Sequence, residues 1–156
     1  MNTFKNKLSK GLCSLSIPLL IAYCLLPTVA SAQTIVTGDF HSLSICNDGT
    51  VRAWGRNDNG QLGNGNNTNS NVPVMVSGLT GVVVLAVGSN HSLALKNDSS
   101  VWAWGRNYSG QLGNGDTTNS KVPILLSGLT RVIAIEGGGS HSLALKNDGT
   151  VWAWGW

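Results

Sequence analysis

Charge is scarce and scattered in this chain. Asp, Glu, Lys and Arg make up 11 % of the 156 residues, and the formal net charge is +3. Three of the basic residues, Lys5, Lys7 and Lys10, stand at the N-terminus, whereas residues 33–156 hold equal numbers of acidic and basic side chains in no cluster. Nucleic-acid binding depends on concentrated positive charge. The sequence therefore predicts no nucleic-acid partner.

Cysteine is also rare, with Cys13, Cys24 and Cys46 only. Cys13 and Cys24 fall in an N-terminal segment that we expect to be removed. Cys46 would then be alone, which excludes a disulfide framework within the mature chain. Its position is taken by Lys96 and Lys146 in the repeats described below, so we expect a spare thiol on a strand surface. The alternative is an intermolecular disulfide.

The longest apolar stretch lies at the N-terminus. Residues 11–27 carry no charge, follow the three lysines and lead to Ala30-Ser31-Ala32. A basic start, a short apolar core and an A-x-A site are typical of a secretory signal peptide. We expect cleavage after Ala32, which leaves a secreted or periplasmic protein without membrane attachment. The alternative is an uncleaved membrane anchor, because residues 11–32 are nearly long enough to span a bilayer.

The most prominent feature of the sequence is an internal repeat. Three segments 50 residues apart read HSLSICNDGTVRAWG (41–55), HSLALKNDSSVWAWG (91–105) and HSLALKNDGTVWAWG (141–155), and residues 41–90 match residues 91–140 at 28 of 50 positions. A fixed period of this size indicates one supersecondary unit copied in tandem. A residue present in every copy is most simply explained by the fold. Candidate functional residues are therefore sought where the copies differ.

Each full repeat predicts four short strands and no helix. The run that begins at His91 alternates its side chains, and a polar turn connects it to an aromatic return strand at Val101–Gly105. Asp-Gly between two alternating runs is a strong hairpin signal, and Ser99 in place of glycine should make the middle turn the most strained. Further strands are expected at residues 72–76, 82–87, 122–126 and 132–136. Short strands in tandem groups of four predict an all-β fold built from propeller blades.

The repeated His-Ser, Trp-Gly and Gly-Gln-Leu-Gly elements resemble the repeat of the regulator of chromosome condensation family, over essentially all of residues 34–156. In that family each repeat implies one blade of a seven-bladed ring. We assign repeats to residues 33–81, 82–131 and, in part, 132–156, after a signal peptide over residues 1–32. That gives an incomplete β-propeller of about two and a half blades, whereas propellers close with about four to eight.

Three explanations of the incomplete ring stay open. The chain is a fragment or a degenerate family member, or several copies assemble into a ring, or it persists as an open arc. An open arc leaves strand edges unpaired, which invites self-association.

The sequence offers no convergent catalytic, metal or cofactor site. The three repeated histidines each precede a serine, but equal copies on separate blades, with sequence neighbours on opposite strand faces, favour structural hydrogen bonds over a nucleophile–base pair. The glycine-rich loop after Gly55 has Gln61 and Leu62 where a phosphate-binding loop needs Lys and Ser or Thr. Residues 57–60 offer oxygen atoms without the spaced carboxylates of a calcium loop. We therefore predict no enzyme activity, no metal and no cofactor.

Variable aromatic and arginine positions are the remaining signal. Arg52 of the first copy is replaced by tryptophan in the others, and Asp58 is replaced by tyrosine in the second. Aromatic and arginine side chains are favoured at the centres of protein-binding surfaces. The candidate partner-binding residues are Arg56, Arg106, Tyr108, Trp102 and Trp152.

These observations predict an exported, non-enzymatic protein-binding or scaffold module. Two alternatives come from the resemblance. One is a secreted enzyme inhibitor, because a bacterial β-lactamase inhibitor protein has a similar repeat fold. The other is guanine-nucleotide exchange, which the founding members of the family perform on a small nuclear GTPase, although the export signal speaks against this role.

Overall fold

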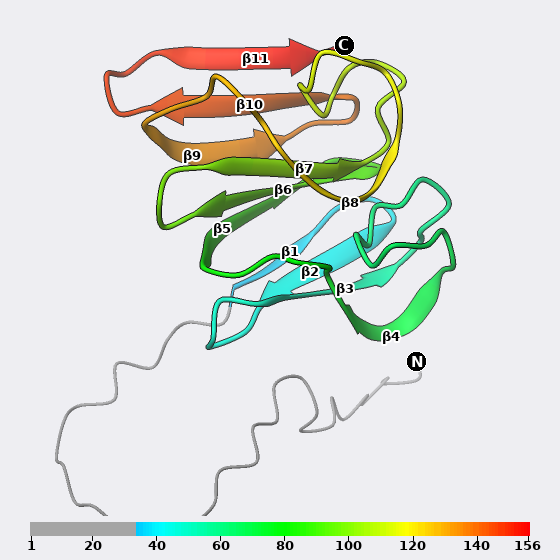
Figure 1. The fold of residues 1–156 in the computed structure, drawn as a ribbon. Helices are drawn as coiled ribbons and strands as arrows, with labels where there is room; N and C mark the ends of the chain where they lie inside the picture. The colour runs from blue at the N-terminus through cyan, green and yellow to red at the C-terminus, as the bar shows by residue number, and fades with distance from the viewer. Residues whose placement is uncertain (1–33) are drawn as a thin grey trace, which may run out of the picture.

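The computed structural model describes residues 34–156, which form eleven strands in three antiparallel sheets. The sheets are stacked on one another, each in chain order (Figure 1). The strands of blade 1 are β1 (Ile35–Thr37), β2 (His41–Ile45), β3 (Val51–Gly55) and β4 (Ser70–Met75). Those of blade 2 are β5 (Val82–Val87), β6 (His91–Lys96), β7 (Val101–Gly105) and β8 (Ser120–Leu125). Blade 3 has β9 (Val132–Gly137), β10 (His141–Lys146) and β11 (Val151–Gly155).

The predicted all-β fold of tandem, incomplete blades is confirmed. Two sheets have four strands, and the third has three among the described residues. The predicted signal peptide over residues 1–32 lies outside the described residues, so it stays a prediction. Within residues 34–156 no helix is both long and apolar enough to cross a membrane.

Local chemistry explains the tight hairpins between β2 and β3, between β6 and β7 and between β10 and β11. In the first, the Asp48 carboxylate accepts hydrogen bonds from the Thr50 amide (2.9 Å) and hydroxyl (2.6 Å). Gly49 follows with φ of 74°, in the left-handed region that glycine tolerates without a Cβ clash. Ser99 holds the same position in blade 2 with φ of 64°. The middle turn therefore carries the strain expected from its sequence.

The hydrophobic core lies between the sheets. One face of blade 1, with Leu43 and Val51 at 0 % exposure, packs against Leu85, Ala94 and Trp104 of blade 2. The opposite face of blade 2 repeats this junction against blade 3, and its buried members include Leu93, Leu95, Val101, Ala103, Val132, Ile135 and Ala144. Alternation of side chains along each strand thus gives blade 2 two buried faces. Each blade is stabilised chiefly by its neighbours, as in other repeat proteins.

Cys46 differs from the expectation of a lone surface thiol. Its side chain is only 4 % exposed, and the residue is disulfide-bonded. The other two cysteines lie outside the described residues.

Candidate protein-binding rim

The repeated histidines join one blade to the next. His41 Nε2 lies 2.8 Å from the hydroxyl of Ser92, and His91 Nε2 lies 2.9 Å from that of Ser142. The Ser92 hydroxyl donates to the Gln61 carbonyl at 2.9 Å, and Ser142 donates to the Gln111 carbonyl at 2.8 Å. Because each hydroxyl proton is used in this way, each imidazole must donate its Nε2 hydrogen. His41 and His91 therefore each bind the serine of the next blade and not their own neighbour in sequence.

This arrangement favours structure over nucleophilic chemistry. Nδ1 of His41 and of His91 is buried and has no hydrogen-bond partner among the described residues, so no carboxylate there orients either ring as in a catalytic triad. Burial lowers the pKa of His41 to about 4. Burial is also the largest cause that lowers the pKa of His91 to about 4, and the nearby histidines add to it. Both imidazoles are thus neutral at pH 7.

Buried amide side chains fix the glycine-rich loops. Asn57 is fully buried, and its amide nitrogen donates to the carbonyls of Asn66 (2.9 Å) and Thr68 (3.1 Å). Its amide oxygen accepts from the Leu62 amide at 2.9 Å. Asn107 holds the loop of blade 2 in a corresponding way. These oxygen atoms are occupied within the loop, and no group of three or more potential metal-ligating side chains occurs within residues 34–156.

The fixed loop of blade 1 presents Arg56. Its guanidinium lies 5.3 Å from the ring centroid of Phe40, and its Nε forms an ion pair with Asp58. The side chains of Arg56 and Asp58 are 46 % and 49 % exposed. The cation is thus held over an aromatic face at the surface.

Blade 2 repeats this construction with a different ring. The Arg106 guanidinium lies 5.4 Å from the ring centroid of Tyr108, which is 65 % exposed. The sequence replaces Asp58 by Tyr108, so an aromatic ring stands where blade 1 has a carboxylate. The described residues contain a single salt bridge, that between Arg56 and Asp58.

The loops of the two blades are joined at this end of the strands. Asn119 of blade 2 donates to the side-chain oxygen of Asn59 at 3.2 Å. Gln61 donates to the side-chain oxygen of Asn90 at 3.3 Å, and the Asn90 carbonyl accepts from the Arg106 amide at 2.9 Å. We call this surface the arginine rim, and it consists of Phe40, Arg56, Asp58, Arg106 and Tyr108.

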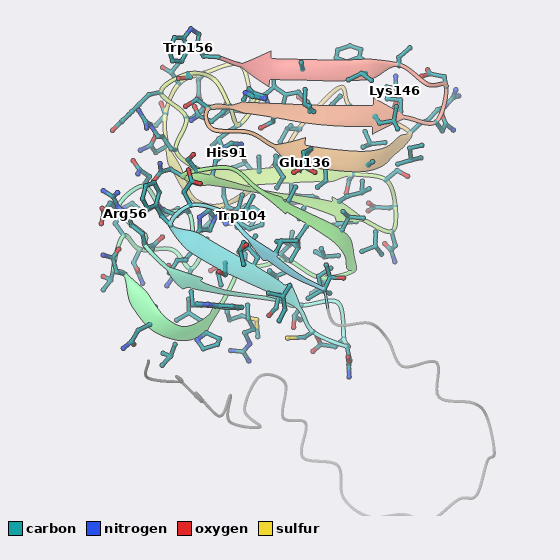
Figure 2. All side chains as sticks on the ribbon, turned by 180° about the vertical axis from the view of Figure 1, so that it is seen from behind. Arg56, His91, Trp104, Glu136, Lys146 and Trp156 are labelled. Atoms are coloured by element: carbon teal, nitrogen blue, oxygen red, sulfur yellow. The ribbon has the colours of Figure 1, made fainter. Side chains whose placement is uncertain are left out.

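Trp102 and Trp152 do not join the rim. They lie toward the opposite ends of their strands, where Lys96 stands 5.8 Å from the Trp102 ring centroid and Lys146 stands 5.5 Å from that of Trp152. Figure 2 shows Arg56 and Lys146 at opposite ends of the stacked strands. Trp102 also packs against the core between blades 1 and 2, and Trp152 is 50 % exposed. The five predicted residues therefore divide into two separate groups.

Sequence reasoning did not identify which side chains the rim arginines and the two lysines contact. Phe40 differs from Asn90 in the second copy, so variability could have indicated its role. The lysine–tryptophan pairs could have been found from the hairpin register, because Lys96 and Trp102 flank the same tight turn.

Comparison with known proteins places the chain in a family. Residues 48–95 and 98–145 match the Regulator of chromosome condensation (RCC1) repeat, and a second description of this repeat matches residues 33–61 and 82–111. The chain belongs to the RCC1 repeat family. Its stacked four-stranded sheets are accordingly RCC1 blades.

Solved structures of the family are similar over most of the described region. Human WBSCR16 superimposes with a TM-score of 0.72 at 28 % identity, over 79 % of this chain and 32 % of that one. Yeast RCC1 (Prp20), solved in complex with Kap60, gives a TM-score of 0.66 at 32 % identity over 80 % of this chain and 30 % of that one. The chain thus spans about a third of these propellers.

Curated relatives match over shorter stretches. The Arabidopsis thaliana ultraviolet-B receptor UVR8 is 40 % identical over 55 residues, which are 35 % of this chain and 12 % of the receptor. Human protein RCC2 is 38 % identical over 56 residues, which are 35 % of this chain and 11 % of that protein. The chain therefore corresponds to a small part of either relative.

Proposed function

We propose that the chain is an exported protein-binding module whose partner docks on the arginine rim. The observation that carries this proposal is the repeated construction of an arginine held over an aromatic ring on a loop fixed by buried amides. Arginine and aromatic side chains are enriched where binding energy concentrates. A loop that is ordered before binding loses less conformational entropy in the complex.

The family supports a protein partner in general terms. Yeast RCC1 was solved bound to Kap60, and a study of Prp20p describes its binding properties to Gsp1p and histones. Neither the inhibitor nor the exchange-factor alternative is favoured by a specific contact in this chain, so neither is proposed.

The charges of the rim indicate what the partner contributes. Asp58 neutralises Arg56 within blade 1. Arg106 has Tyr108 at the corresponding position, and no carboxylate among the described residues forms an ion pair with it. The two oxygen atoms of a carboxylate accept the paired N–H groups of a guanidinium with favourable geometry. We infer that the partner brings an Asp or Glu side chain to Arg106 and apolar surface to Tyr108.

Capture from the extracellular or periplasmic fluid of the source organism tests the rim. The immobilised chain is compared with an Arg106→Ala/Tyr108→Ala variant and with a Lys146→Ala control, which removes a similar cation–aromatic pair at the other end of the strands. We expect one protein to be captured by the wild type and the control and lost with the double variant. Equal thermal stability of the three forms excludes unfolding as the cause. Equal capture by all three would contradict the rim as the docking site.

Export is tested separately by N-terminal sequencing of the protein that cells release. The expected first residue is Gln33, because the A-x-A site ends at Ala32. Retention of Met1 in cell-associated protein would contradict export.

A further inference from the structure

The two loops of the arginine rim are held in the same way. In blade 1 the Arg56 amide donates to the Phe40 carbonyl at 2.9 Å, and in blade 2 the Arg106 amide donates to the Asn90 carbonyl at the same distance. In each loop a buried asparagine side chain accepts from the leucine amide five residues later, also at 2.9 Å. Because the backbones are fixed alike, the residue after this asparagine decides what each guanidinium faces.

That residue differs in charge between the two loops. In blade 1 it is Asp58, whose carboxylate forms an ion pair with Arg56. In blade 2 it is Tyr108, whose ring centroid lies 5.4 Å from the Arg106 guanidinium. The Arg56–Asp58 pair is the only salt bridge within residues 34–156. One guanidinium of the rim is therefore neutralised by its own loop, whereas the other faces an uncharged ring.

The loop of blade 1 does not need the Asp58 carboxylate for its shape. The side chains of Arg56 and Asp58 are 46 % and 49 % exposed, and an exposed ion pair of this kind contributes little to folding. The bonds that fix the loop come instead from the buried side chain of Asn57. The loop of blade 2 keeps the corresponding bonds with tyrosine at this position. Recognition therefore explains the carboxylate better than folding does.

We propose that Asp58 is the specificity-determining residue of the arginine rim, where it occupies Arg56 in place of a partner's carboxylate and thereby rejects segments that carry several carboxylates. A second carboxylate that approached Arg56 would have to displace Asp58, and it would meet a like charge as it did so. Arg106 has no competitor of this kind among the described residues. Repulsive groups contribute to specificity as much as attractive ones do.

The rim then fits a protein segment with a single carboxylate beside apolar surface. The carboxylate meets Arg106, and the apolar atoms meet the rings of Tyr108 and Phe40, which are 65 % and 48 % exposed. A run of acidic residues is disfavoured because only one of the two guanidinium groups is available to it. This inference rests on the proposed function, since it concerns which partners the same surface accepts.

Fluorescence anisotropy with a labelled hexaglutamate peptide tests this role on the 156-residue protein at low ionic strength, where exposed charges are screened least. Asp58→Tyr copies the loop of blade 2 into blade 1, and Tyr108→Asp makes the opposite exchange. We expect Asp58→Tyr to bind the peptide about fivefold more tightly than the wild type, because both guanidinium groups are then available. Tyr108→Asp should bind it about fivefold more weakly, because neither is.

Two controls separate the ion pair from net charge. Asp98→Asn removes the same charge at the opposite end of the strands, and asparagine can still accept the hydrogen bonds of Ser100. It should leave the affinity for hexaglutamate within about twofold of the wild type. Asp58→Asn should tighten binding about fivefold in the wild type but less than about twofold in an Arg56→Ala background, because the carboxylate acts through that guanidinium. Circular dichroism confirms that every variant is folded.

Three results would overturn the role of Asp58. The first is equal affinity of the wild type, Asp58→Asn and Asp58→Tyr for hexaglutamate, and the second is no binding by any form. The third is equal tightening by Asp58→Asn with and without Arg56, because the carboxylate would then act through net charge alone. The proposed function is decided separately by partner capture. Capture that is lost with Arg106→Ala/Tyr108→Ala would retain the docking site even if the peptide affinities reject the role of Asp58.

Discussion

Acidification from pH 7 to pH 5 is expected to lower the free energy of unfolding by about 4 kcal/mol, because two buried imidazoles hold their neutral form only in the folded chain. His41 and His91 are 3 % and 0 % exposed, and burial lowers the pKa of both from 6.5 to about 4. The unfolded chain therefore binds more protons than the folded chain between these two values. The contribution of these two histidines to the free energy of unfolding is fully present above pH 6.5. It is lost as the pH decreases toward 4 and no longer changes below that value.

The magnitude follows from the difference between the two pKa values. A histidine with a pKa of 6.5 when unfolded and about 4 when folded loses about 2 kcal/mol of stabilisation between pH 7 and pH 5. Two such groups give about 4 kcal/mol, which is a large part of the 5–15 kcal/mol typical of a folded domain, on the order of half. Near pH 5 the slope approaches about 2.7 kcal/mol per pH unit, the value for two protons.

The carboxylates of the three tight turns do not interfere in this range. The pKa values of Asp48, Asp98 and Asp148 are lowered, first by hydrogen bonds from the side chains of Thr50, Ser100 and Thr150. A carboxyl group whose folded pKa lies below its unfolded value loses its contribution only as the pH falls below the unfolded value of 3.8. The stabilisation from these three aspartates is therefore unchanged between pH 5 and pH 7, where that from His41 and His91 is lost.

Urea unfolding at a series of pH values provides the measurement. The wild type should take up about two protons on unfolding near pH 5. His91→Gln removes one titrating group while keeping a donor for the Ser142 hydroxyl, so its pH slope should be about half as steep. A wild-type slope below that for one proton, or an unchanged slope in the variant, would refute the assignment of neutral, buried imidazoles.

Three further changes test the packing between blades. Ser99→Gly should raise the free energy of unfolding by about 1 kcal/mol in thermal or urea unfolding, because Ser99 has φ of 64°; a loss of stability would contradict strain in this turn. Ser92→Ala should lower it by about 1–3 kcal/mol, because the His41 donor loses its partner and the Gln61 carbonyl keeps only the Trp104 donor. The control Ser42→Ala, on the open side of blade 1, should have a smaller effect in the same assay, and equal losses would count against the inter-blade bond. Leu93→Ala should cost about 2–5 kcal/mol, whereas Leu143→Ala, in the same position on the uncovered face, should cost less than half as much; equal losses would mean that the face of blade 3 is covered.

The strands could be predicted from the sequence because their signals are local. The alternation after His91, the Asn-Asp turn and the aromatic return strand lie within fifteen residues, and they determine the hairpin of β6 and β7. The outer strand of each complete blade, β4 or β8, was expected to begin at Val72 or Val122 and begins two residues earlier, at Ser70 or Ser120. Strand ends depend on pairing with a neighbour, which a single strand's sequence does not specify.

The candidate site was only partly predictable for a related reason. Variation among the copies identified Arg56, Arg106 and Tyr108, which the structure places at one end of the strands. The same signal selected Trp102 and Trp152, which lie elsewhere, because variability does not record position along a strand. The bond between His41 and Ser92 joins residues 51 positions apart. It depends on the stacking of two sheets, and no local pattern contains that information.

Identical residues carry different energies in the three copies, because their burial differs. The repeated valine is at 0 % exposure in blades 1 and 2 and at 66 % in blade 3. Trp104 is at 0 % exposure between blades 1 and 2, and its indole nitrogen donates to the Gln61 carbonyl at 2.9 Å. Burial of such side chains contributes about 1.5–3 kcal/mol each, so the same side chain stabilises the stack most where a neighbouring blade covers it. The arginine rim lies outside both core clusters, so a partner bound there stabilises the folded chain through the binding equilibrium and not through added core contacts.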